Sequence, residues 1–428
     1  MPTETQHTTP PAQTPAPQPK AKPKADPNTG PKPRLTHPLC GADLRTIAEV
    51  AASAEGISPS GVARLAIAAL AASARLPVTL AESLGPGRGG AEASLERPPV
   101  FIVGHWRSGT THLYNVMARS ARFSSVPPIA TGLPWDFVLL DRFLGPLLRK
   151  TLPTDRYIDR IPVNPDSPQE DEIALANMQR LSFYHGLYIP RRIGREIDRG
   201  IFLDGATPAE VRRWQRCARR FFAKLERTQP GRALLIKNPV YTARVALLRE
   251  TFPGAKFIHI HRDPYRVLPS MRNFYEVLFK QLGLGPARTR SGPVDIDAVV
   301  IGTYARMMRT LDDETKDLPE SDLVTVRFED FEQDPLGQVR RVYETLGIAG
   351  GPESTASPDG ADGFEADRPE FERYLESVKG YKKNSYAPDP EIARLVNEHW
   401  GEWVDKLGYE RHDTTDPAPH DVAQASRL

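Results

Sequence analysis

The stretch that decides the fold spans residues 99–119 and reads PVFIVGHWRSGTTHLYNVMAR. Its first part, Pro99 to Val103, is an apolar run with β-branched and aromatic residues, which predicts a buried strand. Its last part, Thr110 to Arg119, has a helical pattern. Between them lies the glycine-rich loop GHWRSGTT at residues 104–111. A strand, a glycine-rich loop and a helix in this order direct backbone N–H groups at phosphate oxygens, so the stretch predicts an anion-binding loop.

The polar side chains of this loop indicate its chemistry. Its spacing resembles the nucleoside-triphosphate loop G-x-x-x-x-G-K-[ST], but Thr110 stands at the lysine position. Arg107 instead places a forked cation inside the loop, and Ser108, Thr110 and Thr111 add hydroxyl donors around Gly109. A glycine turn that merely opens a helix would explain the glycines but not this set of donors.

Apolar runs followed by helical patterns recur along the chain. The further runs are residues 233–236, 256–260 and 323–326, and the helical patterns after them are residues 242–251, 265–281 and 335–346. Buried runs that alternate with helices predict an α/β fold, in which a parallel sheet is covered on both faces. Ligands bind at the carboxyl ends of such strands. The Gly/Pro-rich stretches 283–293 and 350–363 are expected to be surface loops.

A second candidate site follows the run at residues 256–260 and reads HRDPYRVLPS at residues 261–270. Arg262 stands at the end of the strand, and Pro264 near the first position of the next helix. Ser270 then lies roughly 9 Å farther along that helix, at about 1.5 Å per residue. Arg262 and Ser270 therefore approach one phosphate only if it lies against the side of the helix.

Together the two segments resemble the sulfotransferase superfamily that uses 3′-phosphoadenosine 5′-phosphosulfate, over a region from Pro98 to Tyr409. In that family a loop matching Arg107 to Thr111 holds the 5′-phosphosulfate, and a segment matching Arg262 to Ser270 binds the 3′-phosphate. Ser167 to Glu172 is similar to the bacterial branch. The resemblance implies a P-loop-like three-layer α/β/α fold with extra N-terminal helices. It also implies transfer of a sulfuryl group to a hydroxyl or amine of a small-molecule, lipid or carbohydrate acceptor.

In-line sulfuryl transfer requires that the two partners be oriented and that charge on the leaving group be stabilised. Lys237, at the end of the run 233–236, is the candidate cation for the leaving group, although a strand-end lysine also reaches solvent. Loop N–H groups, Arg107 and this lysine suffice without magnesium, and the sequence shows no metal-ligand spacing. The basic segment 379–386 resembles the part of the family that closes over the nucleotide, and Lys383 is its candidate donor-binding residue, with a basic surface turn as the alternative.

Three consecutive acids are candidates for the base that the acceptor hydroxyl needs. The resemblance suggests that one of Glu170, Asp171 and Glu172 faces the acceptor, and Glu170 and Glu172 are the catalytic candidates. A structural interpretation competes, because Ser167 and Glu170 fit a capping box in which the acids occupy the first helical turn. Neighbouring helical residues diverge by about 100°, so Asp171 and Glu172 are not expected to point the same way.

Histidines provide rival bases. His105 and His112 flank the loop, and a neutral imidazole accepts a proton. Each also fits a packing role, His105 as part of the pocket lining and His112 on the helix after the loop. Related sequences often carry a histidine shortly after Lys-x-Pro, but this chain has Tyr241 there. That departure counts against a catalytic role at position 241.

Helices around residues 135–148 and 173–188 are expected to build the acceptor pocket. The first carries apolar residues at helical spacing, and these form either a pocket wall or a core face: Phe137, Leu140, Phe143, Leu144 and Leu147. A wall of this kind suits an acceptor with a hydrophobic body. A carbohydrate acceptor stays open, as does the oligomeric state.

Composition divides the chain into a core and two tails. Residues 1–34 hold 10 of the 42 prolines and no aromatic, Val or Ile residue, so they are expected to be disordered, as are residues 411–428. Residues 35–95 are expected to be a helical segment packed on a domain at residues 96–410. A net charge of +2 excludes a nucleic-acid-coating protein, and two cysteines fit a reducing cytoplasm.

The apolar run 65–74 is shorter than the roughly 20 residues of a spanning helix, so residues 59–80 are expected to be a helix of the soluble protein. Two other functions remain open. A nucleotide kinase fits the loop spacing but not Thr110, and a non-catalytic nucleotide-binding or scaffold protein would use Arg-rich stretches such as Arg212 to Arg220 as its surface.

Overall fold

The computed structural model describes residues 37–85, 94–142, 145, 167–289, 292–348, 361–379 and 389–413. The described residues belong to one compact unit. The predicted tail at residues 1–34, most of the predicted tail from 411 onward and Lys383 lie outside the described residues, as do Phe143, Leu144 and Leu147.

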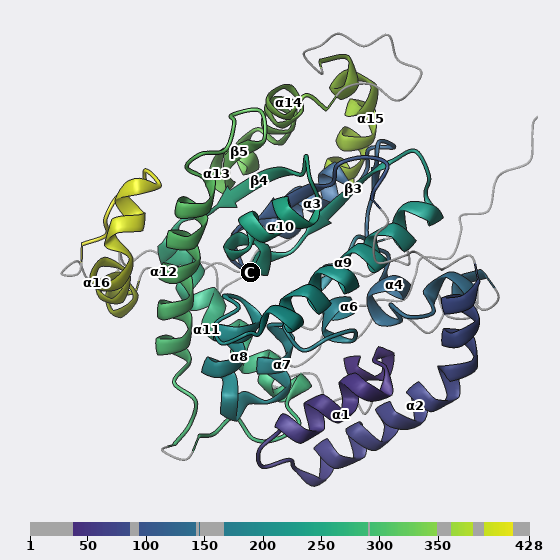
Figure 1. The fold of residues 1–428 in the computed structure, drawn as a ribbon. Helices are drawn as coiled ribbons and strands as arrows, with labels where there is room; N and C mark the ends of the chain where they lie inside the picture. The colour runs from purple at the N-terminus through teal and green to yellow at the C-terminus, as the bar shows by residue number, and fades with distance from the viewer. Residues whose placement is uncertain are drawn as a thin grey trace, which may run out of the picture. The chain divides into compact units, whose positions relative to one another are not determined.

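A five-stranded parallel sheet forms the centre of the fold (Figure 1). The strands are β1 (Val100–Val103), β2 (Phe123–Ser124), β3 (Ala233–Lys237), β4 (Lys256–His261) and β5 (Leu323–Arg327). Their order across the sheet is β2-β3-β1-β4-β5. The predicted α/β fold with a central parallel sheet is thereby confirmed. The two-residue strand β2 was not predicted, because it is too short to show a hydrophobic period.

Alternating residues of β1 divide the hydrophobic core into two layers. Phe101 and Val103 pack into one cluster, and Val100 and Ile102 into the other. This division follows from the period of a strand, in which successive side chains point to opposite faces. The helices therefore cover both faces of the sheet, which makes three layers.

The helices of the first cluster include α9 (Pro208–Thr228), α10 (Val245–Thr251), α11 (Pro264–Leu282), α12 (Ile296–Thr315) and α16 (Pro390–Lys406). The second cluster contains residues of α3 (Thr110–Met117), α13 (Phe328–Gln333), α14 (Pro335–Leu346) and α15 (Ala361–Ser377). Shorter elements are η1 (Pro38–Gly41), α4 (Pro128–Gly132), α6 (Glu172–Ala176), α7 (Tyr184–Tyr188), η2 (Pro190–Arg192), α8 (Ile193–Gly200) and η3 (Pro239–Ala243).

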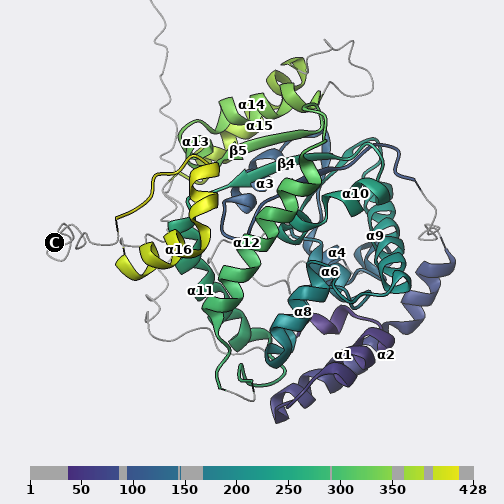
Figure 2. The ribbon, with the colours of Figure 1, turned by 60° about the vertical axis from the view of Figure 1, so that its left-hand side comes forward.

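The N-terminal helices α1 (Leu44–Ser53) and α2 (Pro59–Leu84) lie together at one end, and α14 and α15 lie at the other (Figures 1 and 2). Arg75 of α2 donates to both carboxylate oxygens of Asp136, at 2.9 and 2.7 Å. By length and composition α2 passes the test for a membrane-crossing helix, with a mean hydropathy of 1.4 over an 18-residue window that is 17% buried. The sequence-based prediction ended this helix at residue 80 and judged its apolar run too short.

Two predictions about the segment after residue 166 were wrong. Residues 167–170 are not helical, and the helix begins at Glu172 with Asp171 at its N-cap, so Ser167 and Glu170 form no capping box. The predicted helix at residues 173–188 is two short helices, α6 and α7, separated by a loop. Phe137 belongs to the core, because it is 2% exposed and lies 6.1 Å from the ring of Phe221.

Candidate functional site

The loop after β1 depends on two glycines that no other residue can replace without movement. A Cβ atom on Gly104 would lie 2.1 Å from the carbonyl oxygen of Ile260, and one on Gly109 would lie 2.0 Å from the ring of Phe328. Both glycines also have positive φ, 142° and 88°. The loop is also bound to η3, the short helix that follows β3, because the Gly104 N–H donates to Thr242 Oγ1 at 2.8 Å.

The loop delivers an open helix N-terminus. Gly109 is the N-cap of α3 and has no side chain to accept from the N–H groups of the first turn. Ser108 and Thr110 are buried at 2% and 4% exposure, and Thr111 is half-buried. Uncapped N–H groups, hydroxyl donors and the positive end of a helix together fit a phosphate or sulfate group.

The two sequence motifs meet at Arg107 and Ser270. Arg107 Nε donates to Ser270 Oγ at 2.7 Å, across 163 positions of the chain. Arg262 Nη1 approaches the carbonyl oxygen of Arg107 at 3.4 Å, and its guanidinium lies over the ring of Phe328 at 4.6 Å. Arg262 Nε is buried without a hydrogen-bond partner in the described part of the chain. This arrangement places two guanidinium groups and a hydroxyl around one location and leaves a buried donor for an anion.

A third strand end contributes Lys237. Its ammonium lies 3.2 Å from Thr111 Oγ1 and forms an ion pair with Glu170. The Lys237 side chain is 1% exposed and that of Glu170 is 23% exposed. The end of β3 therefore places the buried ammonium of Lys237 beside the anion-binding loop. Its partner carboxylate, that of Glu170, is partly exposed to solvent.

Asp171 and Glu172 converge, contrary to the expectation that they diverge. Asn238 Nδ2 donates to Asp171 Oδ1 at 3.0 Å and to Glu172 Oε2 at 2.8 Å. Asp171 is the N-cap but has helical backbone angles (φ −80°, ψ −11°), so the two carboxylates meet because Asn238 Nδ2 carries two N–H groups, one for each. Glu172 also accepts from Ser182 Oγ at 2.6 Å and from the Phe183 N–H at 3.1 Å. Both carboxyl groups are therefore held inside the protein.

Burial dominates the titration of these two acids. It raises the pKa of Asp171 to about 8, although the hydrogen bond from the Tyr241 hydroxyl acts in the opposite direction. The pKa of Glu172 is also raised by burial, against the attraction of the Arg244 guanidinium. Arg244 is itself buried and donates through Nε to the carbonyl oxygen of Ile201 at 3.0 Å.

Three residues of this site had no role in the sequence-based prediction: Thr242, Asn238 and Arg244. Tyr241 was considered there only as a departure from the histidine of related sequences. Asn238 carried one signal, since Asn before Pro is typical of a turn, and its side chain accepts from the Val240 N–H at 3.0 Å. Its bonds to the acids depend on tertiary structure and leave no local pattern.

The two histidine candidates occupy different environments. His105 is 2% exposed, its Nδ1 lies 3.0 Å from the carbonyl oxygen of Trp106, and its ring packs against Tyr304. Burial lowers the pKa of His105 to about 4. The His105 Nε2 atom is buried and has no hydrogen-bond partner among the described residues. His112 is half-buried on α3, 5.1 Å from the ring of Phe331.

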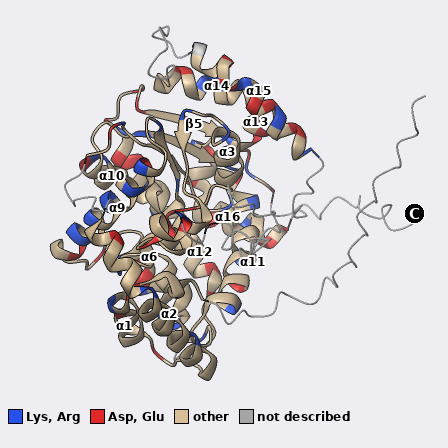
Figure 3. Cartoon of the chain, turned by 90° about the vertical axis from the view of Figure 1, so that its right-hand side faces the viewer, with Lys and Arg blue, Asp and Glu red and all other residues tan. Residues whose placement is uncertain are grey.

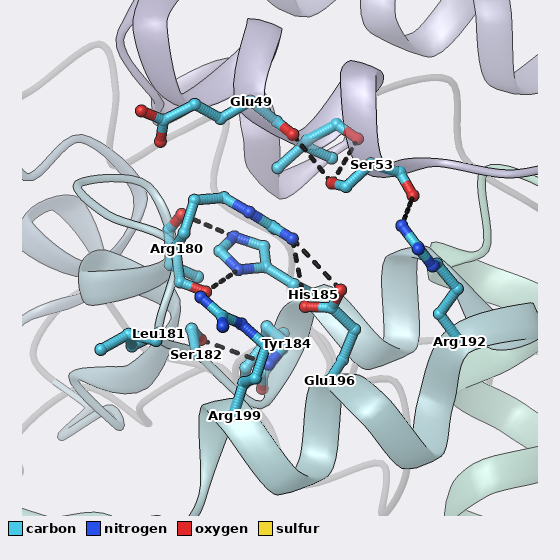
Figure 4. Close-up of polar contacts among 12 residues, drawn as sticks. Glu49, Ser53, Arg180, Leu181, Ser182, Tyr184, His185, Arg192, Glu196 and Arg199 are labelled. Carbon is cyan, nitrogen blue, oxygen red and sulfur yellow. Dashed lines mark hydrogen bonds and ion pairs between the residues drawn. The ribbon is translucent and has the colours of Figure 1, made fainter. Parts of the chain in front are cut away.

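A cavity of about 780 Å³ lies between α1, α8 and α9 and contains none of the predicted site residues. Its charged lining residues are Arg45, Arg180, Arg192, Arg195, Arg199, Arg213, Arg216, Glu49, Glu196 and Glu210. Seven arginines against three glutamates leave an excess of four positive charges. Figure 4 shows Arg180 directed at Glu196 and Arg192 at the Ser53 backbone, with donor–acceptor distances of 3.1 and 2.8 Å. Among the described residues, no group of three or more His, Cys, Asp or Glu could hold a metal ion.

The sequence is similar to known proteins over most of its length. The model described as "Sulfotransferase family" matches residues 98–350. The omega-hydroxy-beta-dihydromenaquinone-9 sulfotransferases of Mycobacterium bovis and Mycobacterium tuberculosis are each 33% identical over 332 residues, which cover 78% of this chain and 80% of each relative.

Solved structures show the same fold. The sulfotransferase STF9 of Mycobacterium avium superposes with a TM-score of 0.62 at 17% identity, covering 85% of this chain and 90% of its own. The sulfotransferase STF1 of Mycobacterium tuberculosis gives a TM-score of 0.52 at 15% identity, covering 76% and 90%.

Proposed function

Because the chain belongs to the sulfotransferase family, we propose that this enzyme takes its sulfuryl group from 3′-phosphoadenosine 5′-phosphosulfate and passes it to a hydroxyl group of a lipid. One observation carries the donor assignment. Arg107, in the loop after β1, donates at 2.7 Å to Ser270 on α11, beside Arg262, which follows the adjacent strand β4. Two clustered anion sites, one at the loop and one at the side of α11, match a donor with phosphate groups at both ends of its ribose.

The loop and α11 divide the donor between them. The N–H groups of the first turn of α3, with Ser108, Thr110 and Thr111, would hold the 5′-phosphosulfate. Arg262 and Ser270 would hold the 3′-phosphate, with Arg107 between the two groups. The uncapped helix start and the buried Nε atom of Arg262 support this division.

In the reaction the acceptor oxygen forms a bond to sulfur while the bond from sulfur to the 5′-phosphate oxygen breaks. The sulfate ester and adenosine 3′,5′-bisphosphate are the products. Lys237 would stabilise the negative charge that develops on the leaving oxygen, because its ammonium lies 3.2 Å from Thr111 in the anion-binding loop.

Glu170 would take the proton of the acceptor hydroxyl. Its side chain is 23% exposed, and it lies beside Lys237. Asp171 and Glu172 are both buried and engaged by Asn238, so we assign them the task of positioning the Glu170 segment and the β3 end. His105 is 2% exposed, whereas the Glu170 side chain is 23% exposed, which favours Glu170 as the base that an acceptor hydroxyl reaches.

The acceptor class rests on the relatives, which are named for a menaquinone bearing an omega-hydroxyl group. A hydroxyl on a long apolar body agrees with the hydrophobic acceptor considered from the sequence. We further propose a cytoplasmic location for the enzyme, supported by the free thiols of Cys40 and Cys217.

Titration calorimetry of the purified protein tests the donor assignment. Adenosine 3′,5′-bisphosphate should bind with or without magnesium, whereas binding of ATP alone, and only with magnesium, would indicate a kinase. The acceptor is tested with donor carrying labelled sulfate and a lipid extract. Label in the organic phase supports a lipid hydroxyl, and label only in water-soluble products would contradict it.

A further inference from the structure

The outward face of α2 is mostly apolar, with Ser73 as an exposed polar residue near its middle. Among the described residues, the large hydrophobic side chains that are exposed all lie on α1 and α2. On α2 they are Val62 (56%), Leu70 (71%), Leu76 (45%), Leu80 (53%) and Leu84 (77%). From Val62 to Leu84 the helix advances about 33 Å, at 1.5 Å per residue. Figure 3 shows α2 almost entirely tan, whereas α9 carries blue segments.

The charged residues of α2 point the other way. Arg64 donates to the Gly283 carbonyl oxygen at 2.9 Å, and Arg75 donates to Asp136. Glu82 accepts from the Leu139 N–H at 2.9 Å and pairs with Lys224. No other Asp, Glu, Lys or Arg occurs between residues 59 and 84. The usual arrangement of a surface helix, with charges outward and apolar residues inward, is therefore reversed.

These inward contacts decide how α2 relates to a bilayer. A helix that crossed a membrane would have to give up the bonds of Arg64, Arg75 and Glu82 to the rest of the protein. A helix that lies in the plane of the interface keeps them and buries only its outer face, about 5–10 Å deep. The exposed strip and the buried charges fit the second arrangement.

A second copy of the chain fits the strip less well. A face about 33 Å long and roughly 10 Å wide offers on the order of 330 Å², whereas a stable interface buries about 800 Å² per partner. A bilayer sets no such requirement. The cavity beside α1, with its excess of arginine, adds positive charge near this end of the protein, which anionic lipid headgroups attract.

We propose that the outward face of α2 holds the enzyme on the surface of a lipid bilayer. The proposal rests on the proposed function, since a lipid acceptor is reached at a membrane. Docking through α2 leaves the donor site at the strand ends open to a soluble nucleotide, while the acceptor arrives from the lipid phase.

Vesicle flotation of the full chain tests the proposal, with vesicles of phosphatidylcholine and phosphatidylglycerol in a ratio of about 7:3. The wild-type protein should float with the vesicles. The variant L70Q/L80Q should lose about tenfold or more in vesicle partitioning, because it removes two apolar side chains from the lipid-facing strip. The matched control is L70M/L80M, which has nearly the same shape and helix propensity but stays apolar, and should float like the wild type.

Binding of adenosine 3′,5′-bisphosphate to each variant separates docking from catalysis and from folding. Equal affinity in wild type, L70Q/L80Q and L70M/L80M shows that the fold and the donor site are intact. If the wild type binds the nucleotide but stays in the soluble fraction, or if L70Q/L80Q floats as well as L70M/L80M, the docking proposal is wrong. A wild type that floats but does not bind the nucleotide overturns the proposed function and leaves the docking face standing.

Discussion

At the scale of single residues, three consecutive acids have three different environments. Glu170 is partly exposed and pairs with Lys237, whereas Asp171 and Glu172 are buried. Glu170→Gln should therefore lower kcat by about 100-fold or more, the usual loss when a general base is removed. Affinity for adenosine 3′,5′-bisphosphate, measured by calorimetry, should stay within a factor of a few. Full turnover in this variant would show that a residue other than Glu170 is the base.

Arg262 is the residue whose loss should act on the donor alone. Arg262→Ala removes a half-buried guanidinium whose Nε atom is buried. It should weaken binding of adenosine 3′,5′-bisphosphate about 10-fold to 100-fold, as for other charged hydrogen bonds. Arg266→Ala is the matched control, because its guanidinium is 55% exposed and pairs only loosely, at 3.5 Å, with Asp263. Equal affinities of the two variants would remove Arg262 from the site.

At the scale of elements, the loop between β1 and α3 is tightly packed at both of its glycines, Gly104 and Gly109. Gly109→Ala should abolish donor binding and lower Tm by several degrees, since its Cβ would meet Phe328 at 2.0 Å and its φ is 88°. Gly231→Ala separates the cost of backbone strain from the cost of the clash, because φ at Gly231 is also positive, at 76°, but no atom lies within 4 Å of a Cβ there. Thermal unfolding of both variants gives the comparison. If Gly109→Ala lowers Tm no more than Gly231→Ala does, the Phe328 ring moves aside and the clash has no cost.

The strands and the anion-binding loop were predictable because their signals are local. A buried parallel strand is a short apolar run, and the loop shows its donors within eight residues, 104–111. The environment of Glu170 was predicted wrongly because its contacts are not local. A capping box explained Ser167 and Glu170 locally, but Glu170 instead pairs with Lys237, 67 positions away. Nothing within the segment indicates that a distant ammonium, or the amide of Asn238, competes with the helix cap.

At the scale of the whole molecule, buried titratable groups set the pH range of stability. Burial lowers the pKa of several histidines, to about 4 for His37, His105 and His261 and about 3 for His259. Between pH 4 and about 6.5 these histidines bind protons in the unfolded chain but stay neutral in the folded protein. The free energy of unfolding therefore falls as the pH falls. Asp171 has the opposite sign, because the folded state keeps its proton up to pH 8 while the unfolded state has lost it.

Stability should therefore be greatest near pH 6.5 and decline on both sides. Thermal unfolding between pH 4.5 and pH 8.5 measures the profile. Asp171→Asn should flatten the decline above about pH 6.5, where the histidines no longer titrate. It should leave the decline below that pH in place, since the histidines are unchanged. If the decline in stability above about pH 6.5 is equally steep in Asp171→Asn, groups other than Asp171 cause it.

The order of the strands has a consequence for synthesis of the protein on the ribosome. Arg107 and Ser270 are 163 positions apart, and Lys237 and Thr111 are 126 positions apart, because the loops that meet at one sheet edge come from distant parts of the chain. At about 5–20 residues per second, some ten to thirty seconds pass between translation of the loop and that of Ser270. During that interval the nucleotide has no complete site and cannot stabilise the nascent chain.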